Sequence, residues 1–185
     1  MKRQIILTSA GFSNKNIEKS FLTMLGINPQ YAKALFIPTA AINDDAKVML
    51  PICRQDLLNA GILDENIISY DLDKPLDYEY AKLFHVIYFC GGSPGHLINR
   101  IHDVDFHLLL EKLLDYGVIY VGVSAGSIIA TADLPDGLHY INCKLRVHQK
   151  NGSPCGLLPI DNCPEVSLTD KQAIRIVNDE ISIFE

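Results

Sequence analysis

The chain has 185 residues, a mass of 20.6 kDa, a formal charge of −6 and a pI near 5.4. Hydrophobic residues make up 48% of it and charged residues 21%, which is globular composition and excludes a disordered, collagen-like or low-complexity protein. The length predicts one domain spanning residues 1–185, large enough to bury about 70% of its extended-chain surface. Because no basic block occurs, we expect no nucleic-acid partner.

The chain ends and the cysteines exclude other classes. The first apolar run, Ile5–Leu7, is too short for a signal-peptide core, and no stretch approaches the roughly 18 apolar residues of a membrane span. We therefore expect a cytoplasmic protein without a membrane partner. The five cysteines form no C-x-x-C pair and no H-E-x-x-H occurs, so we expect no metal and interpret the cysteines as small buried apolar residues. No organic cofactor is implied either.

Short β-rich runs alternate with helical patterns along the first two thirds of the chain. Helices are predicted at Asn16–Leu25, Asp44–Asn59 (bent or interrupted at Pro51), Pro94–Ile101, Asp105–Leu114 and Ala125–Thr131. Strands are predicted at Gln4–Leu7, Ala34–Ile37, Asn66–Tyr70, Val86–Cys90, Val118–Val121, Leu145–His148, Gln172–Val177 and Ile181–Phe184. The alternation indicates an α/β fold in which helices cover both faces of a mostly parallel central sheet, with reactive groups at the carboxyl ends of the strands.

One motif between a predicted strand and a predicted helix carries chemistry. Residues 122–126 read Gly-Val-Ser-Ala-Gly, the G-x-S-x-G pattern of a nucleophile elbow. The flanking glycines are needed where a Cβ would clash in the tight turn, so Ser124 is expected to project above the sheet. The N–H of Ala125, at the helix start, is expected to help stabilise an oxyanion.

A second G-x-S-x-G stands at residues 91–95, but proline follows its serine. Proline has no N–H to donate, so we interpret Ser93 as a helix N-cap with Pro94 at the first helical position. The N–H groups of Gly91 and Gly92 remain suitable donors toward a ligand beside Ser124.

A nucleophilic serine needs a base, and His148 is the first choice among six histidines because it ends a predicted strand just before a turn. The acid that would orient this histidine is open between Glu165, Asp161, Asp133 and Asp136. A third interpretation makes Cys90 the nucleophile, although it precedes its glycines and so lacks the elbow.

The chain resembles the peptidase E (aspartyl dipeptidase) family, serine hydrolases on a class I glutamine amidotransferase-like, flavodoxin-like three-layer α/β fold. The specific part of the resemblance is the elbow together with the upstream Gly91-Gly92. Supporting segments lie at residues 7–11, 36–40, 88–92, 146–148 and 171–174.

The resemblance implies that Ser124 is the nucleophile and His148 its histidine. The family's acid has been placed either soon after the nucleophile, roughly at Asp133 here, or in a late Pro-Glu, which matches Pro164-Glu165. We prefer Glu165 and expect a Ser124-His148-Glu165 triad in which Ala125 and Gly91 or Gly92 bind the oxyanion.

Two departures from the family fall where substrate is expected to bind. Gly91-Gly92-Ser93-Pro94 stands in place of Gly-Gly-Asn-Thr, and the segment after His148 is short. The leading hypothesis is a serine peptidase or dipeptidase for a small peptide-like substrate, with N-terminal aspartate as one candidate residue; the alternative is a non-catalytic ligand-binding or sensing module on the same fold. Cations that could meet an acidic substrate are Arg100, Lys144, Arg146 and Arg175. Sheets of this kind often pair at an edge, which leaves a homodimer open.

Overall fold

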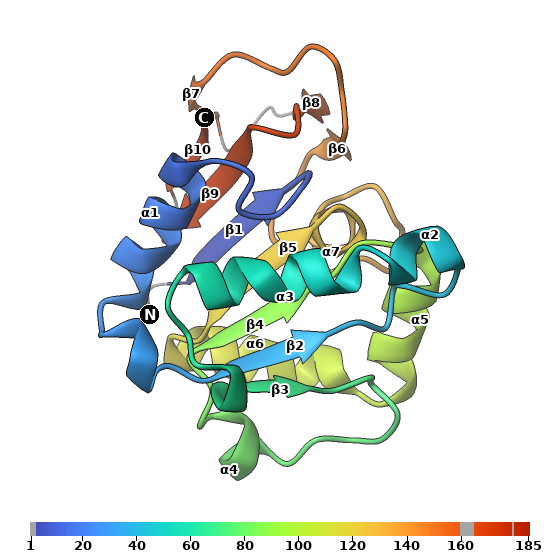
Figure 1. Cartoon of the computed structure of the whole chain (residues 1–185). Helices are drawn as coiled ribbons and strands as arrows, with labels where there is room; N and C mark the ends of the chain where they lie inside the picture. The colour runs from blue at the N-terminus through green and yellow to red at the C-terminus, as the bar shows by residue number, and fades with distance from the viewer. Residues whose placement is uncertain (1–2, 160–164, 179) are drawn as a thin grey trace.

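The computed structural model describes residues 3–159, 165–178 and 180–185. Its centre is an eight-stranded sheet in the order β3-β2-β4-β5-β1-β9-β10-β7. The five strands from β3 to β1 are parallel to one another, and β9, β10 and β7 continue the sheet in antiparallel pairs. Helices cover both faces of this sheet (Figure 1), so the predicted three-layer α/β fold with a mostly parallel sheet is confirmed.

The strands lie close to the predicted positions. The parallel part comprises β1 (Gln4–Thr8), β2 (Ala34–Ile37), β3 (Ile67–Ser69), β4 (Val86–Phe89) and β5 (Ile119–Val123), and the antiparallel part comprises β7 (Gly156–Leu157), β9 (Ala173–Val177) and β10 (Glu180–Phe184). In the central strands β2, β4 and β5 every residue is buried, as expected for parallel strands covered on both faces.

The two faces of the sheet carry separate hydrophobic layers because successive side chains of a strand point in opposite directions. On one face Tyr88 packs with α1 (Lys15–Leu25) and α3 (Leu50–Asn59). On the other face Phe89 packs with α5 (Pro94–Asp103), α6 (Phe106–Tyr116) and α7 (Ala125–Ile128). Figure 1 shows α1 and α3 crossing the near face of the sheet and α6 lying behind it.

The long helix predicted over Asp44–Asn59 is interrupted, as its proline suggested. It divides into α2 (Asp44–Lys47) and α3, and Pro51 occupies the first turn of α3, where its missing N–H leaves no hydrogen bond unmade. The short helix α4 (Tyr78–Ala81) was not predicted from the sequence. None of the helices in the described part of the chain is long and apolar enough to cross a bilayer.

Beyond α7 the chain forms short strands and turns. The predicted strand at Leu145–His148 is shorter than expected: β6 (Lys144–Arg146) pairs in parallel with β8 (Glu165–Ser167), and His148 lies outside it. His148 has a φ of +56°, a left-handed conformation that ends extended structure. This turn places His148 at the same edge of the molecule as the end of β5.

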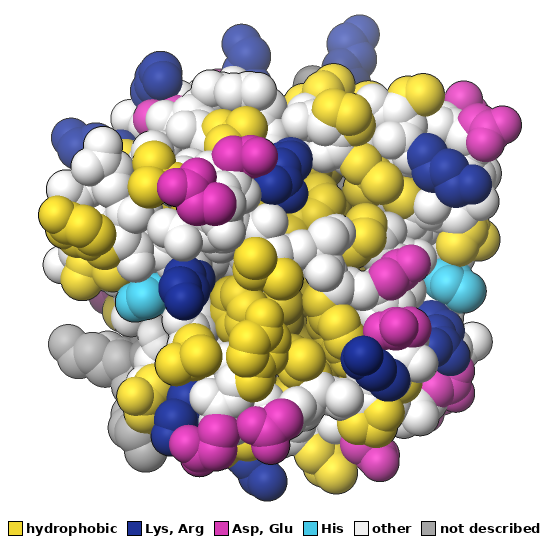
Figure 2. All heavy atoms as spheres, turned by 60° about the horizontal axis from the view of Figure 1, so that its bottom comes forward, with side chains coloured by type: hydrophobic (Ala, Val, Ile, Leu, Met, Phe, Trp, Pro, Cys, Tyr) yellow, Lys and Arg dark blue, Asp and Glu magenta, His cyan; other side chains and the backbone are white. Residues whose placement is uncertain are grey.

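The outer edge of the parallel sheet is formed by β3. Exposed Ile68, Tyr80 and Leu83 line a hollow of about 120 Å³ there, and Figure 2, which brings this side of the molecule forward, shows hydrophobic side chains gathered on it. A homodimer through a sheet edge stays a prediction.

Candidate active site

Ser124 occupies the turn between β5 and α7 with a φ of +49° and a ψ of −104°, outside the regions that a non-glycine residue ordinarily adopts. The motif glycines are required by contact. A Cβ on Gly122 would lie 2.5 Å from the carbonyl oxygen of Gly126, and a Cβ on Gly126 would lie 2.6 Å from the Cβ of Phe89. The backbone at Ser124 therefore forms the tight, strained turn expected of an elbow, and the serine side chain is partly exposed.

The end of β1 holds this elbow in place. The Ser124 N–H donates to the carbonyl oxygen of Thr8 at 2.9 Å. The hydroxyl of Ser127, in the first turn of α7, accepts from the Thr8 N–H at 2.9 Å and lies 2.8 Å from the carbonyl oxygens of Thr8 and Gly122. Ser127 and Thr8 are fully buried, so these bonds face no competition from water. Ser127 is thus a positioning residue that the sequence analysis did not single out.

His148 lies beside the elbow, and its Nε2 is 3.1 Å from the Ser124 hydroxyl. Its backbone N–H donates to Ser9, whose hydroxyl in turn donates to the carbonyl oxygen of Leu168. Ser9 directly follows β1, so the strand that anchors the serine also anchors the histidine. Ser124 and His148 are therefore brought together as the sequence analysis expected.

The carboxylate that contacts His148 is that of Asp170, not Glu165. Asp170 Oδ1 lies 2.6 Å from His148 Nδ1, the ring nitrogen that faces away from Ser124. Glu165, at the start of β8, pairs instead with the guanidinium of Arg146 at 3.4 Å. The expectation that Glu165 orients the histidine is thus not met, because β8 pairs with β6 and turns its first residue toward Arg146.

The other acids weighed from the sequence are also engaged elsewhere or not described. Asp133 accepts from Thr131 and from the Leu145 N–H, and lies 3.5 Å from Arg146. Asp136 contacts His102 through its backbone oxygen. Asp161 and Pro164 lie outside the described residues.

Asp170 was missed because its place depends on an antiparallel strand. The register of β9 on β1 sets Ala173 opposite Thr8, so the residues just before β9 lie at the carboxyl end of β1, next to Ser9 and the elbow. The sequence does place an acidic residue, Asp170, shortly before the predicted strand Gln172–Val177. This position points to the site only once that strand is known to run antiparallel beside β1.

The two glycines expected to bind an oxyanion differ in their surroundings. A Cβ on Gly91 would lie 3.3 Å from the Ser124 Cβ, so this backbone passes directly over the elbow. However, the Gly91 N–H faces the Cys53 thiol and helps to lower the pKa of that thiol. Gly92 has a φ of +141°, and among the described residues its N–H has no recorded hydrogen bond. As predicted, Ser93 is the N-cap of α5 and accepts from the His96 N–H at 3.3 Å, with Pro94 in the first turn.

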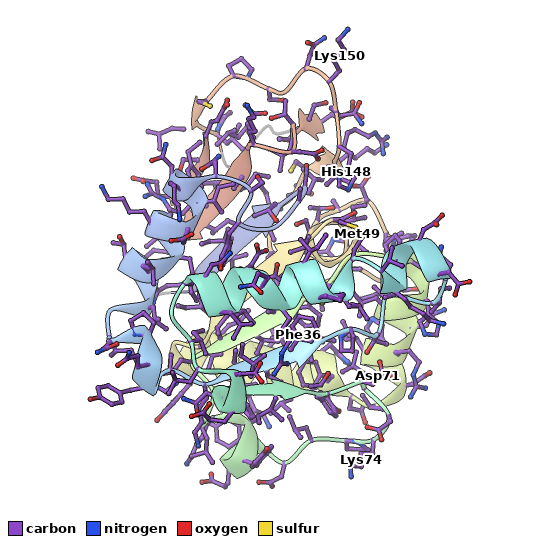
Figure 3. All side chains as sticks on the ribbon, in the orientation of Figure 1. Phe36, Met49, Asp71, Lys74, His148 and Lys150 are labelled. Atoms are coloured by element: carbon purple, nitrogen blue, oxygen red, sulfur yellow. The ribbon has the colours of Figure 1, made fainter. Side chains whose placement is uncertain are left out.

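A cavity of about 350 Å³ opens on Ser124. It lies between the carboxyl ends of β4 and β5 and the segment of α2 and α3. Figure 3 labels His148 and Met49 on this side of the molecule, on two segments that lie far apart in the sequence. Its lining residues are Ser9, Ala10, Asn43, Asp45, Ala46, Met49, Leu50, Ile52, Cys53, Asp56, Cys90, Gly91, Gly92, Val123, Ser124 and His148.

Three ionisable groups of the cavity wall have perturbed pKa values. Burial raises the pKa of the Asp56 carboxyl, although the Tyr88 hydroxyl donates to it at 2.6 Å and the Phe12 N–H at 3.0 Å. The hydrogen bond with Cys90 lowers the pKa of the Cys53 thiol, and burial raises that of Cys90 well above its ordinary value. Cys90, fully buried and protonated, has neither the elbow nor the thiolate that a nucleophile needs.

The remaining cysteines and the candidate cations are placed elsewhere. Cys143 is buried as expected, whereas Cys155 is exposed, and Cys163 lies outside the described residues. Arg100 bonds to the Leu72 carbonyl oxygen and to Asp103, and Arg175 pairs with Glu180 at 3.7 Å. Neither these two nor Lys144 and Arg146 line the cavity at Ser124.

Comparison with known proteins places this geometry in a family. The chain is similar in structure to a peptidase E candidate from Listeria monocytogenes EGD-e, with a TM-score of 0.77 and 19% identity over 100% of this chain and 99% of that one. It is also similar to a peptidase from an acI-B1 Actinobacterium, with a TM-score of 0.70 and 17% identity over 98% of this chain and 86% of that one. These likenesses show the shared fold. The model of peptidase family S51 matches residues 5–177, and the chain therefore belongs to peptidase family S51, a family of serine peptidases of the peptidase E type.

Proposed function

We propose that this protein hydrolyses small peptides through Ser124, His148 and Asp170. The observation that carries the proposal is the chain of contacts Ser124 Oγ to His148 Nε2 at 3.1 Å and His148 Nδ1 to Asp170 Oδ1 at 2.6 Å. Nucleophile, base and orienting acid stand in the order that a serine hydrolase needs, and triads are recognised by this geometry rather than by chain order.

In the first half of the reaction the Ser124 Oγ forms a bond to the peptide carbonyl carbon, and its proton passes to His148 Nε2. The tetrahedral intermediate then loses its amine, which takes that proton as the C–N bond breaks, leaving an ester on Ser124. In the second half a water molecule loses a proton to His148 and attacks the ester, and Ser124 regains the proton as the acid product leaves. Asp170 keeps Nδ1 protonated throughout and stabilises the transient imidazolium.

The oxyanion is assigned to the N–H groups of Ala125 and Gly92. Ala125 directly follows the nucleophile, which is the usual first donor of an elbow. Gly92 is favoured over Gly91 because the Gly91 N–H faces the Cys53 thiol. One such donor contributes typically about 3 kcal/mol to transition-state stabilisation.

The volume of the cavity limits the size of the substrate. At about 350 Å³ it is at the lower end of the range for ligand pockets. This favours a dipeptide or another short peptide over a folded protein.

The proposal is tested with matched serine variants. Purified protein is treated with a fluorophosphonate, which modifies activated serines, and the labelled residue is identified by mass spectrometry; a dipeptide panel is assayed in parallel. Labelling and hydrolysis are expected to fall at least about 10³-fold in Ser124→Ala and to persist in Ser93→Ala, which removes the serine of the other G-x-S-x-G. Unchanged turnover in Ser124→Ala would refute the proposal, and ligand binding without labelling or turnover would favour the non-catalytic module.

A further inference from the structure

We propose that the cavity at Ser124 binds an uncharged, apolar side chain on the residue whose carbonyl is attacked, and that it rejects an acidic one. This inference rests on the proposed function and names the substrate class of the same site. It argues against N-terminal aspartate, which the sequence analysis gave as one candidate residue. Three features carry it: the walls of the cavity, the charges around it and its position relative to His148.

The walls of the cavity are mostly carbon and sulfur. Met49, Leu50 and Ile52 approach from the start of α3, and Val123 and Cys90 line the strand ends. Met49 and Ile52 are about half exposed although both are large and apolar. An apolar side chain entering between them would remove this surface from water, which contributes roughly 25 cal/mol per Å² buried.

The charges around the cavity oppose an acidic substrate. Within the described lining there are two carboxylates, Asp45 and Asp56, and no lysine or arginine. Asp45 is exposed at the start of α2, so an aspartyl side chain would meet like charge there and no cation to pair with. Asp56 is satisfied by Tyr88 and Phe12. Because these two donors already engage its carboxylate and desolvation raises its pKa, Asp56 is also a poor partner for a cationic side chain.

The position of His148 assigns the cavity to the acyl side of the substrate. His148 is tied to Ser9 and Asp170, on the β1 and β9 side of Ser124. The leaving amine takes its proton from this histidine, so it must depart on that side. His148, Ser9 and Ala10 line the near end of the cavity, and most of its lining lies in the other direction, toward the end of β4 and α3. The residue that donates the carbonyl therefore has its side chain in the cavity.

Aminoboronic acids test this assignment because boron takes the place of the attacked carbonyl carbon and carries only the acyl-side side chain. The Ser124 Oγ forms a bond to boron, giving a tetrahedral boronate, and its proton passes to His148. Compounds with the side chains of leucine, aspartate and lysine are compared as inhibitors of fluorophosphonate labelling at Ser124. We expect the leucine analogue to bind at least tenfold more tightly than either charged analogue.

A matched pair of variants tests the role of the walls. Met49→Lys keeps an unbranched side chain of similar length but places a cation in the cavity, whereas Val48→Lys adds the same charge at a neighbouring exposed residue that does not line it. In Met49→Lys the preference for the leucine over the aspartate analogue is expected to fall at least fivefold. In Val48→Lys it is expected to change less than twofold.

The outcomes separate this inference from the proposed function. If Ser124 is labelled but the aspartate or the lysine analogue binds as tightly as the leucine analogue, the inference is wrong and the serine peptidase mechanism stands. The same conclusion follows if Met49→Lys and Val48→Lys shift the preference equally. If Ser124 is not labelled at all, the proposed function is wrong and the inference falls with it.

Discussion

Replacing Asp170 by asparagine removes the charge beside His148 while keeping the shape of the side chain. The Nδ1–Oδ1 distance of 2.6 Å puts the centres of the imidazolium and the carboxylate about 4 Å apart. At that separation their attraction is about 1 kcal/mol in bulk water and about 4 kcal/mol at an effective dielectric constant of 20. Both side chains are about half exposed, at 50% and 60%, so the contribution lies between these limits.

Since 1.36 kcal/mol corresponds to a tenfold change in rate, those limits correspond to losses of about 5-fold and about 900-fold. We expect Asp170→Asn to lower kcat about 100-fold and to leave KM nearly unchanged, because Asp170 contacts the histidine and not the substrate cavity. The rate of fluorophosphonate labelling at Ser124 should fall in parallel, which gives a readout that depends on no particular peptide.

Glu165→Gln is the matched control. The pair of Glu165 with Arg146 is half exposed and spans 3.4 Å, and exposed pairs of this kind contribute at most about 1 kcal/mol. The Glu165→Gln variant should therefore keep its kcat within about threefold. Thermal melting would first show that both variants are folded. A larger loss of kcat in Glu165→Gln than in Asp170→Asn would then refute the assignment of Asp170 as the acid that orients His148.

Two further predictions concern stability. Gly92→Ala should lower the free energy of unfolding by about 1–3 kcal/mol through the backbone conformation alone, since the φ of Gly92 is +141°. A clash adds to this loss, because the new Cβ would lie 2.0 Å from the Ala40 carbonyl oxygen. Gly95→Ala is the control in the first turn of α5, where the new Cβ would meet no atom within 4 Å, and it should be neutral or stabilising; equal melting temperatures for the two variants would contradict the reasoning. Asp56→Asn should raise the melting temperature near neutral pH more than it does at pH 3. Burial raises the folded-state pKa of Asp56, so the folded wild type holds more protons than the unfolded chain and loses stability as the pH rises above about 3.9. Asparagine does not titrate, so the variant avoids this loss. A difference in melting temperature that is independent of pH would show that Asp56 does not titrate differently in the folded state.

Local pattern alone predicted most of the parallel part of the fold. The apolar runs at Ala34–Ile37 and Val86–Phe89 are strands because both faces are buried, and the glycines around Ser124 are required by close backbone contact. These features depend on residues close in sequence, so they can be inferred without knowledge of the tertiary structure.

Only the tertiary structure identified the rest of the site. Asp170 reaches His148 because β9 runs antiparallel beside β1. The cavity is lined by residues around the break between α2 and α3 and by residues at the ends of β4 and β5. The resemblance to peptidase E favoured Glu165, but β8 pairs with β6 and directs Glu165 to Arg146. The sequence by itself predicted Ser124 as the nucleophile and His148 as its histidine, because elbow and strand-end patterns are local. The position of Asp170 and the shape of the cavity depend on how distant strands pair. Such pairing cannot be predicted from any short stretch of the chain.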